Sequence, residues 1–457
     1  MPPPALKTRP APAWRNLNTL QSLWASMYII WALDVLLLIA AITGAQVHRG
    51  AMQAVGKDSA PSIIHAQHIK TALADMDANA ANELLGQSGQ MSDAVNAYEN
   101  RRVEAATALI EAAKNITYAG EQKPIEAIQV GMGTYERMVQ RARDLHERAD
   151  ATYVNAYREA ARVMDDEILP KADELDKVNL DELERAYGEQ SGKSIAAIIF
   201  LLLMGAALVA ALVAIQKFLN HRTRRILNPM LIAATLVTLG FILYTFSILG
   251  SERHHLKVAK EDAFESIHAL WRARAVAYAA NADESRYLLD VTHAQEHERK
   301  FHEKADALAT LPSGTSFSRA AEASRDGGKL DGFKGYLADE LNNITFEGER
   351  DAALSALARF GDYLNIDGEI RRLQSIGKHA EALELCIGTK RGESNWAFDR
   401  FDQAIGKTLD INQQAFDAAV AGGFSALSHF EIEAGIVAVI IALLAFFGLI
   451  KRIQEYQ

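Results

Sequence analysis

Polar side chains gather at one level of two helical segments of the sequence. The first segment carries Asp77, Asn79 and Asn82 beside an apolar stripe, and the second carries Asn281, Asp283 and Arg286 at the matching level. At 100° per residue, Asp77 and Asn79 lie on opposite flanks of that stripe. Carboxylate, amide and guanidinium groups at such flanks can border a groove and contact a ligand or a partner protein. Ordinary polarity on the flank of a bundle helix is the alternative.

One ionisable residue, Asp34, interrupts a long apolar run near the N-terminus. A carboxylate at mid-bilayer is costly unless it is sheltered, so it suggests a functional role by default. We expect hydroxyl groups of a later apolar run to shelter it, and the candidates are Thr235, Thr238, Tyr244 and Thr245. Asp34 is then a packing or switching contact between spans, or alternatively a tolerated polar contact with no role in signalling.

Histidines occur at helical spacing in two places. They are His65 with His68, and His293 with His297, with Glu296 between the latter two and His302 beyond them. Two ligands on one helix face do not make a metal site without a third, so we predict no metal and no cofactor. The sequence has no phosphate-binding loop, nucleophile elbow or CxxC pair, so we predict no enzymatic activity. Cys386, the one cysteine, fits a buried apolar role better than a reactive one.

Four long apolar runs determine how these residues are positioned. The runs cover residues 23–45, 194–215, 230–250 and 434–450. A helix needs about 20 apolar residues to cross the hydrocarbon core of a bilayer, so we predict four transmembrane helices. The first run is longer than the apolar part of a typical signal peptide, and we expect it to remain as an anchor.

Basic residues predict the orientation of these four spans. The three short flanking segments, residues 1–22, 216–229 and 451–457, are basic. Basic segments stay in the cytoplasm, so both termini are predicted to be cytoplasmic. The whole chain has a net charge of −10 although these short segments are basic, so the large segments 46–193 and 251–433 must be acidic. Because the basic segments at the other ends of the spans are cytoplasmic, both large segments are predicted to face outside. Acidic segments argue against nucleic acid as a partner.

Both large segments show helical periodicity and no alternating strand pattern. Ile69, Leu73, Met76, Ala80 and Leu84 recur at three- and four-residue spacing. Breaks at Gly86 and Gly89, at residues 120–124 and at Leu169-Pro170 divide the first segment into four helices. The prediction is therefore an all-α protein with an antiparallel four-helix bundle in each large segment.

The second large segment repeats the plan of the first. Residues 77–80 and Leu84-Leu85 resemble residues 281–284 and Leu288-Leu289 at an offset of 204, and Val178-Asn179 resembles Ile411-Asn412 at an offset of 233. The second copy is therefore longer. We place the insert in the Gly- and Ser-rich stretch 312–348 and expect a mobile excursion with one short helix at residues 337–343. Two bundles in one chain could pair as a pseudo-dimer, and homo-oligomers are possible as well.

The first predicted bundle helix of each large segment contains a stretch that resembles a known sensor family. Residues 72–82 (ALADMDANAAN) and 277–289 (AYAANADESRYLL) resemble the first bundle helix of the four-helix-bundle sensor modules of bacterial chemoreceptors. The order span, bundle, span is also similar to that of these modules. The chain departs from the chemoreceptor pattern because its second span is followed by about 14 residues and a third span, without a signalling hairpin.

The tandem, output-free arrangement resembles the GlnX-type relay family of bacterial amino-acid sensing. That resemblance implies a non-enzymatic relay in the bacterial cytoplasmic (inner) membrane, between an extracytoplasmic solute-binding protein and a cytoplasmic Ser/Thr kinase. An assembly scaffold with the bundles as spacers is the alternative. A transporter is disfavoured because the spans contain no broken helices.

Two further features bear on how such a relay would work. The loop residues Arg222, Arg224 and Arg225 can dock a cytoplasmic partner, or they can simply set orientation and contact anionic lipid. Small residues at four-residue spacing, Ala206, Ala210 and Ala214 in one span and Ala434, Ala438 and Ala442 in another, predict closely packed helices that can slide.

Overall fold

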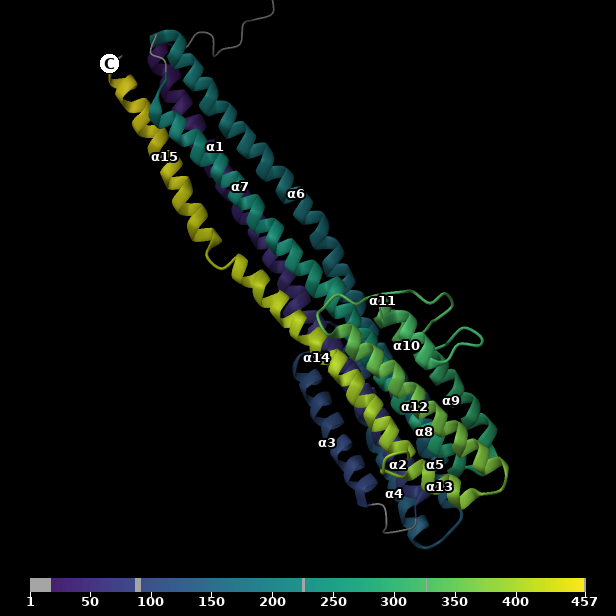
Figure 1. The fold of residues 1–457 in the computed structure, drawn as a ribbon. Helices are drawn as coiled ribbons and strands as arrows, with labels where there is room; N and C mark the ends of the chain where they lie inside the picture. The colour runs from purple at the N-terminus through teal and green to yellow at the C-terminus, as the bar shows by residue number, and fades with distance from the viewer. Residues whose placement is uncertain (1–17, 87–91, 224–226, 326, 456–457) are drawn as a thin grey trace, which may run out of the picture. The chain divides into compact units, whose positions relative to one another are not determined.

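The computed structural model describes residues 18–86, 92–223, 227–325 and 327–455, and these residues form fifteen α-helices (Figure 1). The helices are α1 (Thr19–Gln53), α2 (Ala60–Leu85), α3 (Ser92–Lys114), α4 (Gln122–Glu147), α5 (Tyr153–Arg162), α6 (Leu169–Thr223), α7 (Pro229–Lys257), α8 (Glu265–Leu289), α9 (Ala294–Leu308), α10 (Phe317–Arg325), α11 (Tyr336–Asn342), α12 (Glu349–Ser375), α13 (His379–Ile387), α14 (Ser394–Ala426) and α15 (Phe430–Gln454). Within the described ranges the only β-type pairing is one bridge between Thr310 and Lys334, so the prediction of an all-α chain is confirmed.

The chain divides into two compact units, which we call the apolar unit and the bundle unit. The apolar unit comprises residues 1–52, 188–255 and 421–457, and the bundle unit comprises residues 53–187 and 256–420. Each unit therefore takes residues from both halves of the sequence.

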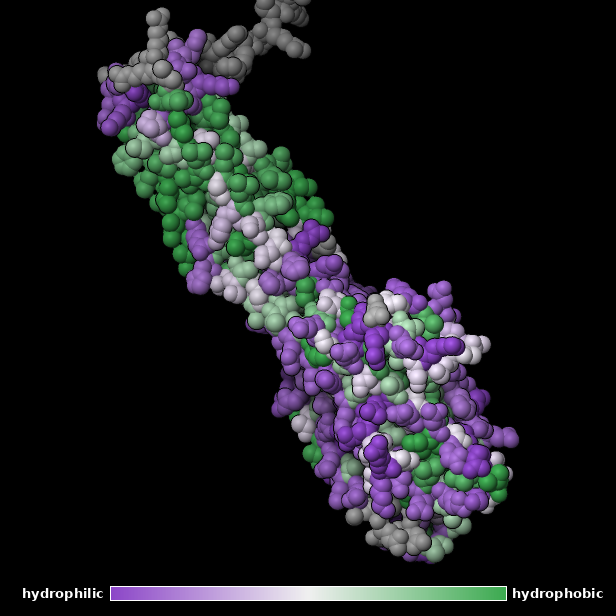
Figure 2. Space-filling view, viewed as in Figure 1, coloured by the Kyte–Doolittle hydropathy of each residue, from purple (hydrophilic) through white to green (hydrophobic). Residues whose placement is uncertain are grey.

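The apolar unit contains the four predicted spans. Four helical stretches, Thr19–Leu85, Tyr153–His221, Pro229–Leu289 and Ser394–Gln454, each include a window long and apolar enough to cross a membrane. Large apolar side chains remain exposed on it, as with Leu243 at 72% and Ile432 at 65% exposure, and Figure 2 shows apolar side chains gathered over these helices. An apolar surface of this extent suits lipid rather than water.

Of the two predicted small-residue series, the one in α15 has a buried member and the one in α6 is exposed. In α15, Ala434 is buried, and Gly448 approaches Leu231 of α7. In α6, however, Ala206, Ala210 and Ala214 are exposed, so the prediction that this series forms a helix contact is wrong. The close approach uses the neighbouring face instead, where a Cβ on Gly205 would meet Ile242 at 2.6 Å.

The first half of the bundle unit contains α2, α3, α4 and α5, followed by the start of α6. Gly86 follows α2, and the chain turns again between α3 and α4, as predicted. The third break was misplaced, because the chain turns between Glu147 and Tyr153 and not at Leu169-Pro170. A π-helical turn, Val163–Ile168, ends directly before α6, and Pro170 lies in the first turn of α6. Proline has no backbone N–H group, and the first turn of a helix tolerates that loss.

The second half contains α8, α9, α12 and α14, with the shorter α10, α11 and α13 between them. Residues 312–348 hold α10 and α11, and α11 (Tyr336–Asn342) lies where the sequence predicts one short helix. α10 packs on α12, and α11 packs on α8 and α12, so this stretch contributes packed structure to the second half.

Helices α2 and α8 form the central contact of the bundle unit and run in parallel register. The rings of His68 and Trp271 lie 5.3 Å apart, and the hydroxyl of Ser285 donates to the side-chain carbonyl of Asn82 at 2.6 Å. Both contacts join residues 203 positions apart, close to the offset of 204 between the repeated sequences. The first bundle helices of the two halves therefore lie side by side at equal height.

A repeated turn shows how similar the halves are. The sequences NITYAGE (115–121) and NITFEGE (343–349) connect helices in the first and second half. Glu121 accepts from the backbone N–H groups of Thr117 and Tyr118 at 2.7 and 2.8 Å, and Glu349 accepts from those of Thr345 and Phe346 at 2.7 and 2.9 Å. The offset here is 228, so most of the extra length of the second copy precedes Asn343.

A polar pair and a π-helical turn repeat as well. Asn115 donates to Ser62 at 3.3 Å, and Asn343 donates to Ser266 at 2.9 Å. Each half also has a π-helical turn before its first bundle helix, at Ala54–Ser59 and Val258–Phe264. Both serines and both π-helical turns stand 204 residues apart, the offset seen in the sequence.

Candidate functional site

The bundle unit encloses a solvent-connected cavity of about 1050 Å³. Its walls come from α2 and α3 of the first half and from α8, α13 and the start of α14 of the second. A volume of this size can enclose a small solute. Because both halves supply walls, an occupant would contact both.

Three of the six predicted contact residues, Asn79, Asn82 and Asn281, line this cavity. Asn82 approaches Asn395 at 3.5 Å across it. Asn281 is 3% exposed and donates to Glu284 at 3.3 Å, while its carbonyl oxygen receives no hydrogen bond from the residues described. Amides of this kind provide both donors and acceptors for a polar ligand.

An ion pair occupies the α2–α3 wall. Asp75 accepts from Arg101 and, at 2.6 Å, from the Asn79 amide. Burial raises the pKa of Asp75 to about 6, although the Arg101 charge opposes this rise. Arg101 also donates to Glu104 at 2.5 Å, so its guanidinium is committed to two carboxylates.

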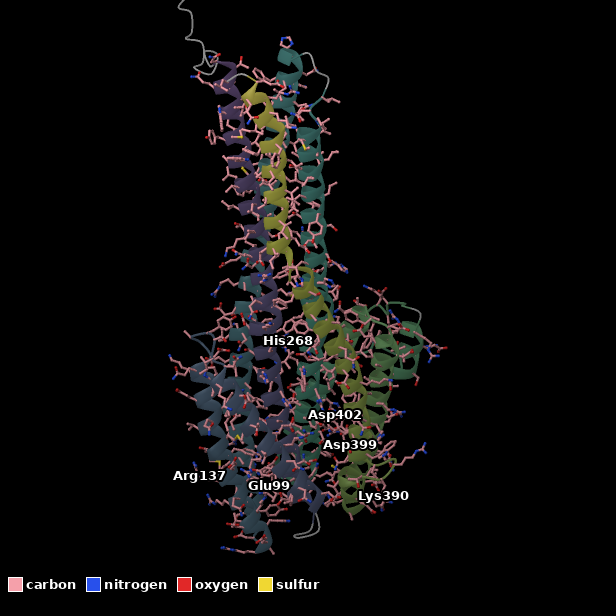
Figure 3. The ribbon with its side chains drawn as sticks, turned by 90° about the vertical axis from the view of Figure 1, so that its left-hand side faces the viewer. Glu99, Arg137, His268, Lys390, Asp399 and Asp402 are labelled. Carbon is pink, nitrogen blue, oxygen red and sulfur yellow. The ribbon has the colours of Figure 1, made fainter. Side chains whose placement is uncertain are left out.

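The opposite wall carries charges without partners. Among the described residues, neither Glu384 nor Asp399 has an ion pair, and Lys390 has no partner for its ammonium group. Asp399 and Lys390 are labelled in Figure 3. On the α3 side, Asp93 is likewise unpaired within the described part of the chain. Burial and the nearby Asp402 raise the pKa of Asp399. Unpaired carboxylates thus outnumber unpaired ammonium groups.

Two aromatic rings form an apolar section of the same wall. Tyr278 of α8 and Phe398 of α14 meet edge to face, with ring centroids 4.9 Å apart. Aromatic faces can bind the apolar part of a solute or an organic cation.

A buried carboxyl group lies directly behind the cavity. Glu284 accepts from Ser394 at 2.8 Å and from Tyr363 at 3.2 Å, besides Asn281. Burial, aided by the negative charge of Asp367, raises the pKa of Glu284 to about 8. Asn281 therefore joins the cavity to a carboxyl group that is protonated at neutral pH.

The other three predicted residues, Asp77, Asp283 and Arg286, do not line the cavity. They form a buried ionic network in which Arg286 pairs with Asp77 and bonds Asp283 and Asp165 at 3.0 Å each. Arg286 is 2% exposed, and Lys304 pairs with Asp283 from α9.

Two tyrosines complete this network. Tyr135 and Tyr157 donate to Asp77 at 2.9 and 3.1 Å. Burial raises the pKa of Asp77, and the Arg286 charge opposes it. At Asp283 burial also acts to raise the pKa, but His297, Lys304 and Arg286 together hold it below its usual range. Fully paired buried charges of this kind fix the register of the helices that carry them.

The histidines of the sequence do not assemble a metal site. Among the described residues no group of three or more His, Cys, Asp or Glu side chains could hold a metal ion. His68 bonds Glu104 at 2.5 Å, and His297 lies 3.6 Å from both Asp283 and Asp290. Cys386 is fully buried against Ser285, with its pKa raised by burial.

Asp34 lies in the core of the apolar unit at 4% exposure. Three of the four hydroxyl groups expected to shelter it bond elsewhere, and the fourth, that of Thr245, has no hydrogen-bond partner among the described residues. Thr235 and Thr238 donate to carbonyls of their own helix at 2.8 Å each, and Tyr244 pairs with Glu433. None of the four hydroxyls bonds Asp34, so that prediction is wrong. Thr235 and Thr238 donate within their own helix instead, as helical threonines commonly do.

A second buried polar cluster of the apolar unit was not identified from the sequence. His48 of α1 bonds Glu252 of α7, and its other ring nitrogen lies 2.7 Å from the hydroxyl of Ser194 in α6. His48 and Glu252 are 3% and 0% exposed. The signal was available, since these two residues are separated by the repeat offset of 204. Arg224, Arg225 and the side chain of Arg222 lie outside the described residues.

Comparison with known proteins agrees with a sensory role. Residues 51–188 match the family model of an actinobacterial sensor domain. No curated protein and no solved structure matches the chain. The matched residues correspond to the first half of the bundle unit. Together with the four candidate spans, this match indicates a bacterial sensor protein of the multi-pass membrane type.

Proposed function

We propose that this chain is a non-enzymatic membrane sensor that binds a small solute in the cavity of its bundle unit and relays the binding event through its spans. The observation that carries the proposal is the shared cavity, in which Asn79 and Asn82 of the first half face Asn281 and Asn395 of the second. A ligand that contacts both halves stabilises one arrangement of α2 against α8, and differential affinity of this kind is what a sensor requires.

The direct test measures binding to the full chain in lipid nanodiscs. A panel of amino acids, amines and dicarboxylates is titrated while the unfolding temperature is recorded. Binding of at least one compound, weakened tenfold or more by Asn281→Leu but not by Asp362→Asn, supports the proposal. Asp362 is a surface residue of α12 paired with Arg359, so its variant is a matched control. If no compound responds to the cavity variant, a directly sensed small solute is excluded.

The proposed topology places the bundle unit outside the cytoplasmic membrane and both termini inside. Its support is the basic character of residues 216–229, in which the side chains of Lys217 and His221 are described and are both exposed. Single cysteines at Val130, 71% exposed, and at Leu227, 62% exposed, test the orientation in cells when Cys386 is replaced by Ala. An impermeant maleimide should label position 130 only.

The output is proposed to come from a separate cytoplasmic protein, such as a Ser/Thr kinase. The supporting observation is the short link between the spans, since α6 ends at Thr223 and α7 begins at Pro229. An extracytoplasmic solute-binding protein is the proposed partner of the bundle unit if the ligand is delivered rather than bound free.

Photocrosslinking separates these partnerships from a scaffold role. A crosslinking residue at Thr389, on the exposed rim of the cavity, should capture a partner in a ligand-dependent way. The same probe at Val130 of α4, away from the cavity, is the control. Capture that does not change with any ligand would favour the scaffold.

A further inference from the structure

The six predicted contact residues on α2 and α8 form two equivalent groups of three, which we call trios. At the repeat offset of 204, Asn79 corresponds to Asp283, Asn82 to Arg286, and Asp77 to Asn281. Because α2 and α8 lie in parallel register, one trio (Asn79, Asn82, Asn281) stands on one side of the α2–α8 contact and the other trio (Asp283, Arg286, Asp77) on the other. The bundle unit therefore has two equivalent positions, of which only the first is a large cavity.

The second position is filled by cationic side chains of the protein itself. The Arg286 guanidinium bonds carboxylates of both halves, Asp77 from α2 and Asp165 and Asp283 from further along the chain. Lys304 of α9 pairs with Asp283 as well. The space left there is small, about 40 Å³ beside Arg286.

The first position lacks the group that fills the second. Arg101 of α3 is a cation in the cavity wall, but it is already paired with Asp75 and Glu104. Asn82 stands where Arg286 stands in the other trio, so no guanidinium enters the cavity from α2. The corresponding volume is open.

The charges left around that opening call for a cation. Asp399, Glu384 and Asp93 have no ion pair among the described residues, and Lys390 is the one lysine that lines the cavity. The other basic side chains there are Arg101, which is paired with Asp75, and the imidazoles of His146 and His379. Asn281, 3% exposed, offers a carbonyl oxygen that the described residues leave without a donor. The Tyr278 and Phe398 rings add a surface that favours organic cations.

We infer that the cavity binds a solute with a net positive charge carried on an amine or guanidinium group, which takes the place that Arg286 holds in the equivalent position. The inference rests on the proposed sensor function and specifies its ligand class. Lys390 at the rim can pair with a carboxylate of the same solute, so basic amino acids fit as well as simple diamines.

The test uses the full chain in nanodiscs with four probes at constant ionic strength: L-arginine, putrescine, L-glutamate and succinate. We expect L-arginine or putrescine to bind and to raise the unfolding temperature, and succinate and L-glutamate to bind at least tenfold more weakly. Asp399→Asn and Glu384→Gln change exposed side chains and should each weaken the cationic probe about tenfold, whereas Asp362→Asn should leave it unchanged.

A second variant imports the residue of the closed position. Asn82→Arg should occupy the cavity and abolish binding of the cationic probe. If this variant fails to fold, the inference is tested by Asp399→Asn and Glu384→Gln alone. Cavity-dependent binding of succinate or L-glutamate, with both cationic probes silent, would overturn the inference while the sensor proposal stands. Absence of any cavity-dependent binding across a broader solute panel would overturn both.

Discussion

His48 and Glu252 hold equivalent positions in the two halves of the sequence, 204 residues apart, and they bond each other inside the apolar unit. Helices α1 and α7 are thereby joined by one histidine and one carboxyl group that are both almost fully buried. The second carboxyl oxygen of Glu252 has no partner among the described residues, so the His48 ring is its main polar contact.

Removal of His48 should destabilise the apolar unit. The variant His48→Ala leaves a buried carboxyl group unpaired, a change that costs about 3 to 5 kcal/mol at buried pairs. We expect a lower unfolding temperature in nanodiscs, and a smaller loss in His48→Leu combined with Glu252→Leu. Arg253→Ala, at an exposed neighbouring position, is the control. Equal losses in the single and double variants would show that the pair has no special role.

The Arg286 network should behave as a structural unit of the bundle. Arg286→Ala leaves the buried Asp77 without a cation and leaves Asp283 with Lys304 alone, so we expect a loss of about 3 to 5 kcal/mol in the stability of the bundle unit. Asp77→Asn combined with Arg286→Gln should lose less than the sum of the two single variants, because the partners are coupled. Additive losses, measured by chemical unfolding in detergent, would contradict this coupling.

Glu284 should make the stability of the bundle unit depend on pH. Its folded pKa, about 8, exceeds the ordinary value of 4.5, so its contribution is full below pH 4.5 and is lost as the pH rises toward 8. Glu284→Gln removes this loss. We expect the unfolding temperature of wild type to fall between pH 5 and pH 8 by about 4 °C more than that of the variant.

The control for this pH effect is Glu303→Gln, which changes an exposed carboxylate of α9. It should follow the wild-type curve. Identical pH dependence in Glu284→Gln and wild type would mean that Glu284 ionises normally in the folded protein.

The repeated turns should depend on their glutamates in the same way. Glu121→Ala and Glu349→Ala each remove an acceptor for two backbone N–H groups, and we expect each to cost about 1 to 3 kcal/mol. Glutamine keeps an acceptor oxygen, so Glu121→Gln should retain most of the stability. Comparable losses for Ala and Gln, read from thermal unfolding, would show that the carboxylate charge is needed rather than an acceptor.

The sequence was sufficient for the four apolar helices, because a run of about 20 apolar residues has few other uses. It was insufficient to separate Asn79 from Asp77, since both lie on flanks of one stripe. Which flank meets the cavity depends on the packing of α8, and that packing joins residues some 200 positions apart.

Two errors have the same origin in local context. Pro170 was expected to break a helix, but the π-helical turn before it removes the conflict with the backbone. The alanine series in α6 was expected to be a contact face, although small residues are also tolerated at exposed positions. The residues between Glu147 and Tyr153 include no glycine or proline, so the sequence contains no helix breaker that would predict this turn.

The paired π-helical turns, Ala54–Ser59 and Val258–Phe264, allow the same helix rotation in both halves. A π-helical turn holds one residue more than the α-helix around it needs, and one residue corresponds to about 100° of rotation. Moving that surplus residue along the chain would rotate the intervening helical turn without breaking the helix. The two π-helical turns begin at equivalent positions of the repeat, so the same shift of a surplus residue is open to both halves.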